Sequence, residues 1–138
     1  RLAAHSDFFS VGTNDLVQYT IAVDRLSEKI AYLYNPLNLS VLRLLRHIVD
    51  ASKKYEIPLS ICGEMAGEPR YTIPLLGLGF RNFSMGTAFM YQIKRIIRSV
   101  KINECEELVD EMMKRDVTEE IEKILLDYLG RKFPTMLF

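Results

Sequence analysis

The chain has 138 residues, of which 18 are Lys or Arg and 18 are Asp or Glu, so its formal net charge is zero. With 49% hydrophobic and 26% charged residues, the composition fits a folded domain and excludes an intrinsically disordered chain. The neutral balance argues against binding of nucleic acid or a membrane surface by bulk charge. No apolar run approaches the roughly 18 residues of a membrane helix, so no membrane insertion is expected. Two cysteines are too few for a disulfide framework, which favours a cytoplasmic location.

The first apolar run covers residues 7–12 and predicts a short buried strand, because it is aromatic and β-branched and stops at a glycine. We expect a polar loop at residues 13–15, which leads into the apolar stretch at residues 16–24. The pair Asn35-Pro36 then predicts a turn.

From Ser40 onward, apolar residues recur at helical spacing with charged residues between them, which predicts an amphipathic helix. Ser40 is the expected N-cap of this helix, and Lys53-Lys54 suit the negative end of its dipole. Pro58 ends the helix, and residues 59–63 predict a second short strand.

Pro69 opens a short predicted helix that ends in the glycine turn at residues 77–79. Residues 82–86 predict a third strand, and an apolar stripe over residues 89–100 predicts the helix that follows it.

The tail of the chain, residues 101–138, is expected to be helical. Asn103 and Glu106 have the spacing of a capping box, and Thr118 is the expected cap of the last helix. Gly130 is the expected stop of that helix.

The alternation of strands and helices predicts an α/β fold with a parallel sheet. The pattern Phe-Ser-x-Gly-Thr occurs at residues 9–13 and again at 83–87, which indicates repeated strand–helix units. A closed (β/α)8 barrel takes about 250 residues. About three units cannot close a barrel, so the alternatives are a small open sheet or the last part of a barrel. The chain also begins at Arg1 without an initiator Met, which suggests a piece of a longer protein.

The expected site lies where the parallel strands end, because ligands bind at that edge in α/β folds. Asn14 and Asp15 suit Mg²⁺ or a polar substrate, or else cap a helix. Arg25 can clamp a phosphate or carboxylate, or else be a surface charge. Cys62 is either a functional thiol at a strand end or a small buried hydrophobe. Cys105, between two glutamates, is expected to be inert.

Three segments carry a resemblance to a known family. Residues 12–20 are Gly-Thr-Asn-Asp-Leu-Val-Gln-Tyr-Thr, residues 22–25 are Ala-Val-Asp-Arg, and residues 62–67 are Cys-Gly-Glu-Met-Ala-Gly. In order and spacing they resemble the C-terminal signature of the phosphoenolpyruvate-utilising enzymes, over about residues 7–100. The Gln-Tyr-Thr and Ala-Val-Asp-Arg spellings favour Enzyme I of the bacterial sugar phosphotransferase system over pyruvate phosphate dikinase and phosphoenolpyruvate synthase.

The resemblance implies a fold and a domain organisation. The phosphoenolpyruvate-binding domain of this family is a (β/α)8 TIM barrel, so the strands here would be its sixth, seventh and eighth. The chain, residues 1–138, would be a C-terminal fragment of that domain. Residues 1–100 would form the last βα units, and residues 101–138 the C-terminal helices.

The resemblance also implies roles for single residues. Asp15 would be one carboxylate ligand of the catalytic Mg²⁺, and Asn14 would contact the phosphoryl group. Arg25 would hold the substrate phosphate, and Gly63 would keep its loop close to the substrate. Cys62 would be the general acid that protonates the enolate carbon to give pyruvate. A thiol suits this role because it is ordinarily mostly protonated at neutral pH.

The implied parent protein transfers the phosphoryl group of phosphoenolpyruvate to an enzyme histidine and then to a small histidine-containing phosphocarrier protein, for sugar uptake. It is expected to be a cytoplasmic homodimer. The second metal carboxylate, further arginines and the phosphorylated histidine of the family have no counterpart here, so the fragment alone is expected to be inactive. The alternatives are the C-terminal domain of a dikinase or synthase, and a non-catalytic dimerisation or regulatory module.

Overall fold

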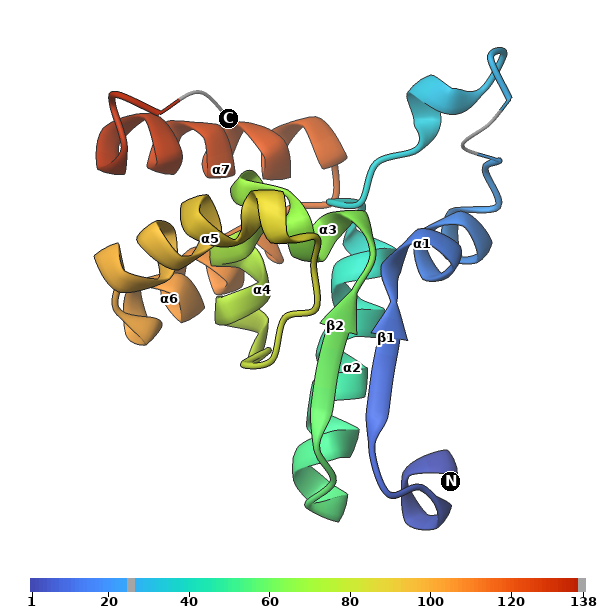
Figure 1. Cartoon of the computed structure of the whole chain (residues 1–138). Coiled ribbons are helices and arrows are strands. Elements are labelled where there is room, and N and C mark those ends of the chain that lie inside the picture. The colour runs from blue at the N-terminus through green and yellow to red at the C-terminus, as the bar shows by residue number, and fades with distance from the viewer. Residues whose placement is uncertain (25–26, 137–138) are drawn as a thin grey trace.

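Two parallel strands form the sheet of the computed structural model, which describes residues 1–24 and 27–136. Strand β1 (Phe9–Gly12) pairs with β2 (Leu59–Cys62) in a register that sets Gly12 opposite Cys62. Both strands lie where the sequence predicts them, and Figure 1 shows them side by side with their carboxyl ends at the same edge. The other elements are η1 (Leu2–His5), α1 (Thr13–Ile21), η2 (Ala31–Leu33), α2 (Leu39–Tyr55), α3 (Glu64–Gly67), η3 (Pro69–Tyr71), α4 (Thr72–Leu78), α5 (Thr87–Ser99), α6 (Ile102–Met112) and α7 (Thr118–Lys132).

The predicted third strand is only partly present. In the described part of the chain, the segment after α4 makes a single parallel bridge to β2, between Phe83 and Ile61. The amide of Ser84 donates to the carbonyl of Ile61 at 2.8 Å, and the amide of Ile61 donates to the carbonyl of Asn82 at 3.0 Å. The Asn82 side chain takes the next acceptor, the carbonyl of Leu59, at 2.9 Å. A side chain therefore takes the backbone acceptor that a longer third strand would use. The fold of the described residues is mixed α/β and mostly helical, with a two-stranded sheet.

Several predicted helix ends are wrong. Residues 13–15 are the first turn of α1 and not a loop. Helix α2 is capped by Asn38, whose side chain accepts from the amide of Ser40 at 2.9 Å, so Ser40 is inside the helix. Helices α6 and α7 have Lys101 and Val117 at their N-cap positions, without a capping side chain. The expected caps Asn103 and Thr118 lie inside the helices, and α7 continues past Gly130 to Lys132.

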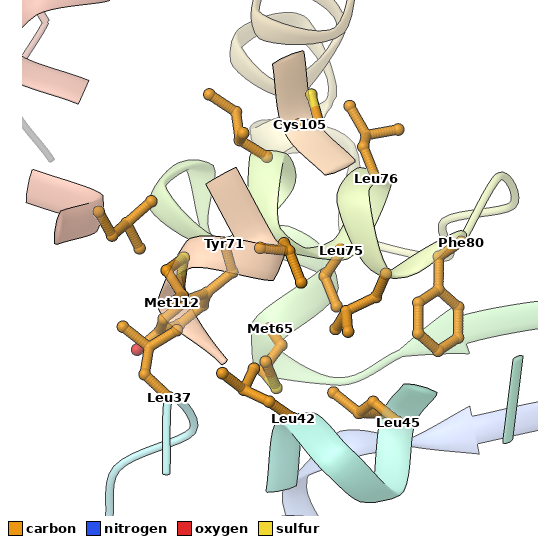
Figure 2. Close-up of a cluster of buried hydrophobic side chains, with 14 of the residues drawn as sticks. Leu37, Leu42, Leu45, Met65, Tyr71, Leu75, Leu76, Phe80, Cys105 and Met112 are labelled. Carbon is orange, nitrogen blue, oxygen red and sulfur yellow. The ribbon is translucent and has the colours of Figure 1, made fainter. Parts of the chain in front are cut away.

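The core lies between the sheet and the helices that follow it. Val11 and Ile61 belong to the same buried cluster as Leu45 and Val49 of α2, so the apolar side of the predicted amphipathic helix does cover one face of the strands. Helix α4 is buried along its whole length. Figure 2 shows side chains of α2, α4 and α6 meeting in this core, with Cys105 and Met112 contributed by α6.

Helices α4 and α6 contact each other backbone to backbone. A Cβ atom added at Gly77 of α4 would lie 2.1 Å from the carbonyl oxygen of Cys105 of α6. Helix α7 is joined to α6 by Lys132, whose ammonium donates to the Glu104 carboxylate of α6 at 2.8 Å. The C-terminal helices therefore share one core with the strand–helix units. Within the described residues, no helix has both the length and the apolar character needed to cross a membrane.

Candidate active site

The two faces of the sheet differ in character because successive side chains along a strand point to opposite sides. Val11, Leu59 and Ile61 are buried against the helices. The other face carries the small residues Ser10, Gly12, Ser60 and Cys62, which are exposed or half-buried. Cys62 therefore presents its thiol on the open face at the last position of its strand, where sequence reasoning places a functional thiol.

The thiol of Cys62 has two close oxygen neighbours on β1. Its sulfur donates to the carbonyl of Val11 at 3.4 Å, and the hydroxyl of Ser10 lies 3.9 Å away. The side chain is half-buried and unoxidised. The thiol is thus held by the adjoining strand and remains open on the other side.

The ends of the two strands are joined by Thr13, the first residue of α1. Its side chain is fully buried, and its hydroxyl donates to the carbonyl of Cys62 at 2.8 Å. The chain then turns at Gly63, whose φ of +89° is in the region that favours glycine. A Cβ atom at Gly63 would lie 2.5 Å from the Thr13 hydroxyl oxygen and 2.9 Å from Oδ1 of Asn14. Only a glycine lets the turn after β2 approach the first turn of α1 this closely.

Asn14 connects α1 to the short helix α3. Its Oδ1 accepts the backbone N–H of Glu64 at 2.9 Å, and its Nδ2 lies 3.4 Å from the Glu64 carboxylate. The helix-capping alternative for Asn14 thus applies to α3, 50 residues away, and not to its own helix. The side-chain amide of Asn14 thus fixes the start of α1 relative to the start of α3.

A cavity of about 500 Å³ lies beside the starts of α1 and α3. Asn14 and Gly63 line it together with Gly67, and Met85 and Phe89 form its apolar wall. Of the residues that the structure describes, Cys62 and Asp15 lie outside this lining. The cavity therefore unites Asn14 and Gly63, while Cys62 and Asp15 stand at the same edge of the sheet without bordering it.

The family follows from comparison with known proteins. A model of the phosphoenolpyruvate-binding domain of phosphoenolpyruvate-utilising enzymes matches residues 1–102. The chain belongs to this family. The ends of β1 and β2 and the starts of α1 and α3 all lie within the matched residues.

Curated relatives extend the similarity into the tail. The chain is 43% identical over 128 residues to the phosphoenolpyruvate-protein phosphotransferase of Haemophilus influenzae, covering 93% of this chain and 22% of that protein. It is 39% identical over 132 residues to the protein of the same name from Mycoplasma genitalium, covering 95% and 23%. For the Listeria monocytogenes protein of that name the identity is 40% over 128 residues, covering 93% and 22%. The chain thus spans about a fifth of the length of these relatives.

The predicted metal ligand of this member of the phosphoenolpyruvate-utilising family, Asp15, is exposed in the first turn of α1. Within residues 1–24 and 27–136, no group of three or more His, Cys, Asp or Glu side chains is placed to hold a metal ion. Arg25, the predicted phosphate ligand, lies outside the described residues.

Cys105 behaves as the sequence predicts for an inert thiol. It is fully buried in α6, and burial raises its pKa to about 11, with a smaller contribution from the Glu104 carboxylate. The thiol therefore stays protonated through the neutral range, which leaves Cys62 as the accessible cysteine of the pair.

Sequence reasoning missed Ser10 and Phe89 as residues of the site, and it placed Thr13 at the strand end without giving it a role. The repeated pattern at residues 9–13 contains Ser10 and Thr13, so their places in the repeat were a usable signal. Phe89 was assigned only to a helical stripe, yet it is half exposed and lines the cavity. The apolar periodicity over residues 89–100 gave no indication that Phe89 would face a cavity and not the core.

Proposed function

We propose that the chain is the C-terminal part of the (β/α)8 barrel of a phosphoenolpyruvate-protein phosphotransferase, with residues 1–100 as its last βα units and residues 101–138 as its C-terminal helices. The observation that carries the proposal is the meeting of the family segments at residues 12–20 and 62–67 at one sheet edge. Gly12 pairs with Cys62 there, and Asn14 binds the amide of Glu64. The phosphotransferase name of the relatives favours this activity over that of a dikinase or synthase.

Cys62 is the proposed general acid. When the phosphoryl group leaves phosphoenolpyruvate, the enolate needs a proton on its terminal carbon to become pyruvate. In this step the S–H bond of Cys62 breaks, a C–H bond forms on the substrate, and the electron pair remains on sulfur. The half-buried thiol on the open face of the sheet supports the assignment, because a proton donor must reach the carbon it protonates.

Asn14, Gly63 and Arg25 are the proposed substrate-binding residues. Asn14 and Gly63 both line the cavity at the carboxyl edge of the sheet, which suits contact with the phosphoryl group and with the substrate near the turn after β2. Arg25 follows in the same motif, and its guanidinium would pair with the phosphate in a bidentate manner.

Mg²⁺ is the proposed cofactor, with Asp15 as one ligand. An exposed carboxylate at the ligand-binding edge fits this ion, which is typically held by one or two carboxylates, water and substrate phosphate oxygens. When bound, the ion would offset negative charge on the phosphoryl and enolate oxygens. The chain's own part is to supply one carboxylate from the first turn of α1.

The whole phosphotransferase is proposed to pass the phosphoryl group to its own histidine and then to a histidine-containing phosphocarrier protein for sugar uptake, as a cytoplasmic homodimer. The isolated chain is proposed to be inactive, because Asp15 is the one metal carboxylate matched here and neither His5 nor His47 has the family's phosphohistidine context. Pyruvate release from phosphoenolpyruvate by the isolated chain would contradict this point.

The test of the acid role is Cys62→Ala in the full-length protein, with Cys105→Ala as the matched control. Loss of a general acid typically lowers turnover by 10²- to 10⁴-fold, so we expect pyruvate formation to fall by about that factor while Mg²⁺ affinity stays near normal. Cys105 is buried away from the site, so its variant keeps turnover once folded. Unchanged turnover in Cys62→Ala would remove Cys62 as the acid.

A further inference from the structure

Ser10 has no role in the proposed reaction, although it lies beside the proposed acid. Ser10 and Cys62 lie on adjacent parallel strands, and both side chains are on the open face of the sheet. The hydroxyl oxygen of Ser10 lies 3.9 Å from the sulfur of Cys62, within the longer range of hydrogen bonds to sulfur. On the same face, the hydroxyl of Ser60 instead donates to the carbonyl of Phe9 at 3.4 Å. Of these two serines, Ser10 is the one bonded to the thiol.

The direction of the bond follows from counting hydrogens. A thiol carries one proton, and Cys62 donates it to the carbonyl of Val11 at 3.4 Å. A carbonyl cannot donate in return. The contact between Ser10 and Cys62 must then be O–H···S, with the serine as donor.

We propose that Ser10 is a positioning residue for Cys62, which fixes the thiol rotamer and stabilises the thiolate that proton donation leaves behind. The inference rests on the proposed acid role of Cys62. The two neighbours of the sulfur act in opposite directions: the Val11 carbonyl favours the protonated thiol, and the Ser10 hydroxyl favours the thiolate. Ser10 keeps its own proton throughout, so it alters the energy of the transfer without taking part in it.

Charged groups on the neighbouring elements do not account for the expected difference. Asp15 on α1 and Glu64 on α3 are the acidic side chains that follow the two strand ends, and both are exposed. Both carboxylates are present in the natural chain and in every variant alike. A change caused by substituting Ser10 therefore reports the hydroxyl.

The first test measures the alkylation rate of Cys62 by iodoacetamide from pH 6 to 10, with the modified peptide quantified by mass spectrometry. Ser10→Ala should move the rate profile to higher pH by up to about one unit, which corresponds to a rate roughly threefold to tenfold lower below the midpoint. Ser10→Thr retains the hydroxyl at an exposed strand position and should restore the natural profile. Ser60→Ala is the matched control and should leave the profile unchanged. Identical profiles for Ser10→Ala and the natural chain would overturn the inference.

The second test separates this inference from the proposed function. In the full-length protein, Ser10→Ala should shift the pH profile of pyruvate formation in the direction seen for alkylation, and Ser10→Thr should reverse the shift. If alkylation shifts and Cys62→Ala abolishes turnover, but Ser10→Ala turns over normally, the positioning role is wrong and the acid role stands. If Cys62→Ala turns over normally, the acid role is wrong, even where the alkylation result shows that the serine controls the thiol.

Discussion

Oδ1 of Asn14 accepts the backbone N–H of Glu64 at 2.9 Å and so joins the starts of helices α1 and α3, which are 50 residues apart in the sequence. The bond satisfies one of the amides that the first turn of α3 leaves unpaired. Because Asn14 and Glu64 both line the same cavity, its shape depends on this contact.

Replacing Asn14 by Ala should weaken this junction. We expect a loss of about 1 kcal/mol in the free energy of unfolding, typical of a removed helix cap, and faster hydrogen exchange at the Glu64 amide. Urea denaturation and NMR exchange measure the two effects. Asn38→Ala, which removes the cap of α2, is the control: it should cost a similar amount without changing exchange at Glu64. If hydrogen exchange at the Glu64 amide were as slow in Asn14→Ala as in the natural chain, the bond would not be what holds the starts of α1 and α3 together.

Gly63 should be far less tolerant of Ala than Gly12. At Gly63 the new Cβ would meet the Thr13 hydroxyl at 2.5 Å, and the φ of +89° adds strain. We expect a destabilisation of about 1–3 kcal/mol or more and partial separation of Thr13 from Cys62. At Gly12 nothing lies within 4 Å and φ is −80°, so Gly12→Ala should change stability little. Equal unfolding midpoints for the two variants would refute the close approach.

Gly77→Ala should disrupt the contact between α4 and α6. The added methyl group would overlap the carbonyl of Cys105, which is backbone and cannot rotate away, so we expect a cost of about 3 kcal/mol or more. The control is Gly130→Ala in α7, where nothing lies within 4 Å. There alanine should stabilise the helix by about 0.5–1 kcal/mol. Thermal unfolding of the two variants should move in opposite directions.

Cys105 makes the fold sensitive to alkaline pH. Its pKa is raised to about 11 in the folded chain, whereas an unfolded cysteine ordinarily ionises near 8.5. The contribution of this thiol to the free energy of unfolding is fully present below about pH 8.5. It falls by roughly 1 kcal/mol per pH unit above that value, because the unfolded state then binds fewer protons. Cys105→Ala should lower stability at neutral pH through the lost side chain.

The difference in unfolding free energy between the natural chain and Cys105→Ala should narrow from pH 8.5 to 10. The tyrosines with raised pKa values, Tyr71 and Tyr128, are present in both chains and begin to contribute above that range. A difference that stays constant with pH would mean that Cys105 ionises equally in the folded and unfolded states.

The strands and the long helix could be predicted because their signals are local. Short apolar runs before Gly12 and after Pro58 indicate strands, and the helical spacing of apolar residues from Val41 to Val49 indicates a helix. The structure forms β1, β2 and α2 at these places. The family motifs likewise lie in short continuous segments, and the family comparison confirms the resemblance drawn from them.

What could not be predicted depends on contacts between distant segments. The bonds from Asn14 to Glu64 and from Thr13 to the carbonyl of Cys62 join residues about 50 positions apart, and no local pattern marks them. The predictions that Asn103 and Thr118 cap their helices were wrong because residue type alone does not show where a helix begins. Helices α6 and α7 begin one or more residues earlier, after Lys101 and Val117. The third strand failed because the Asn82 side chain takes the place of a ladder bond.

The close contact of α4 with α6 has a practical consequence for anyone who trims this chain. The family match ends at residue 102, where α6 begins, and a truncation at that boundary would look natural from the sequence. It would strip the α6 backbone from Gly77 and remove the α6 side chains Cys105 and Met112 from the core. The physical unit is thus longer than the matched domain, and shortened versions should retain both C-terminal helices to remain soluble.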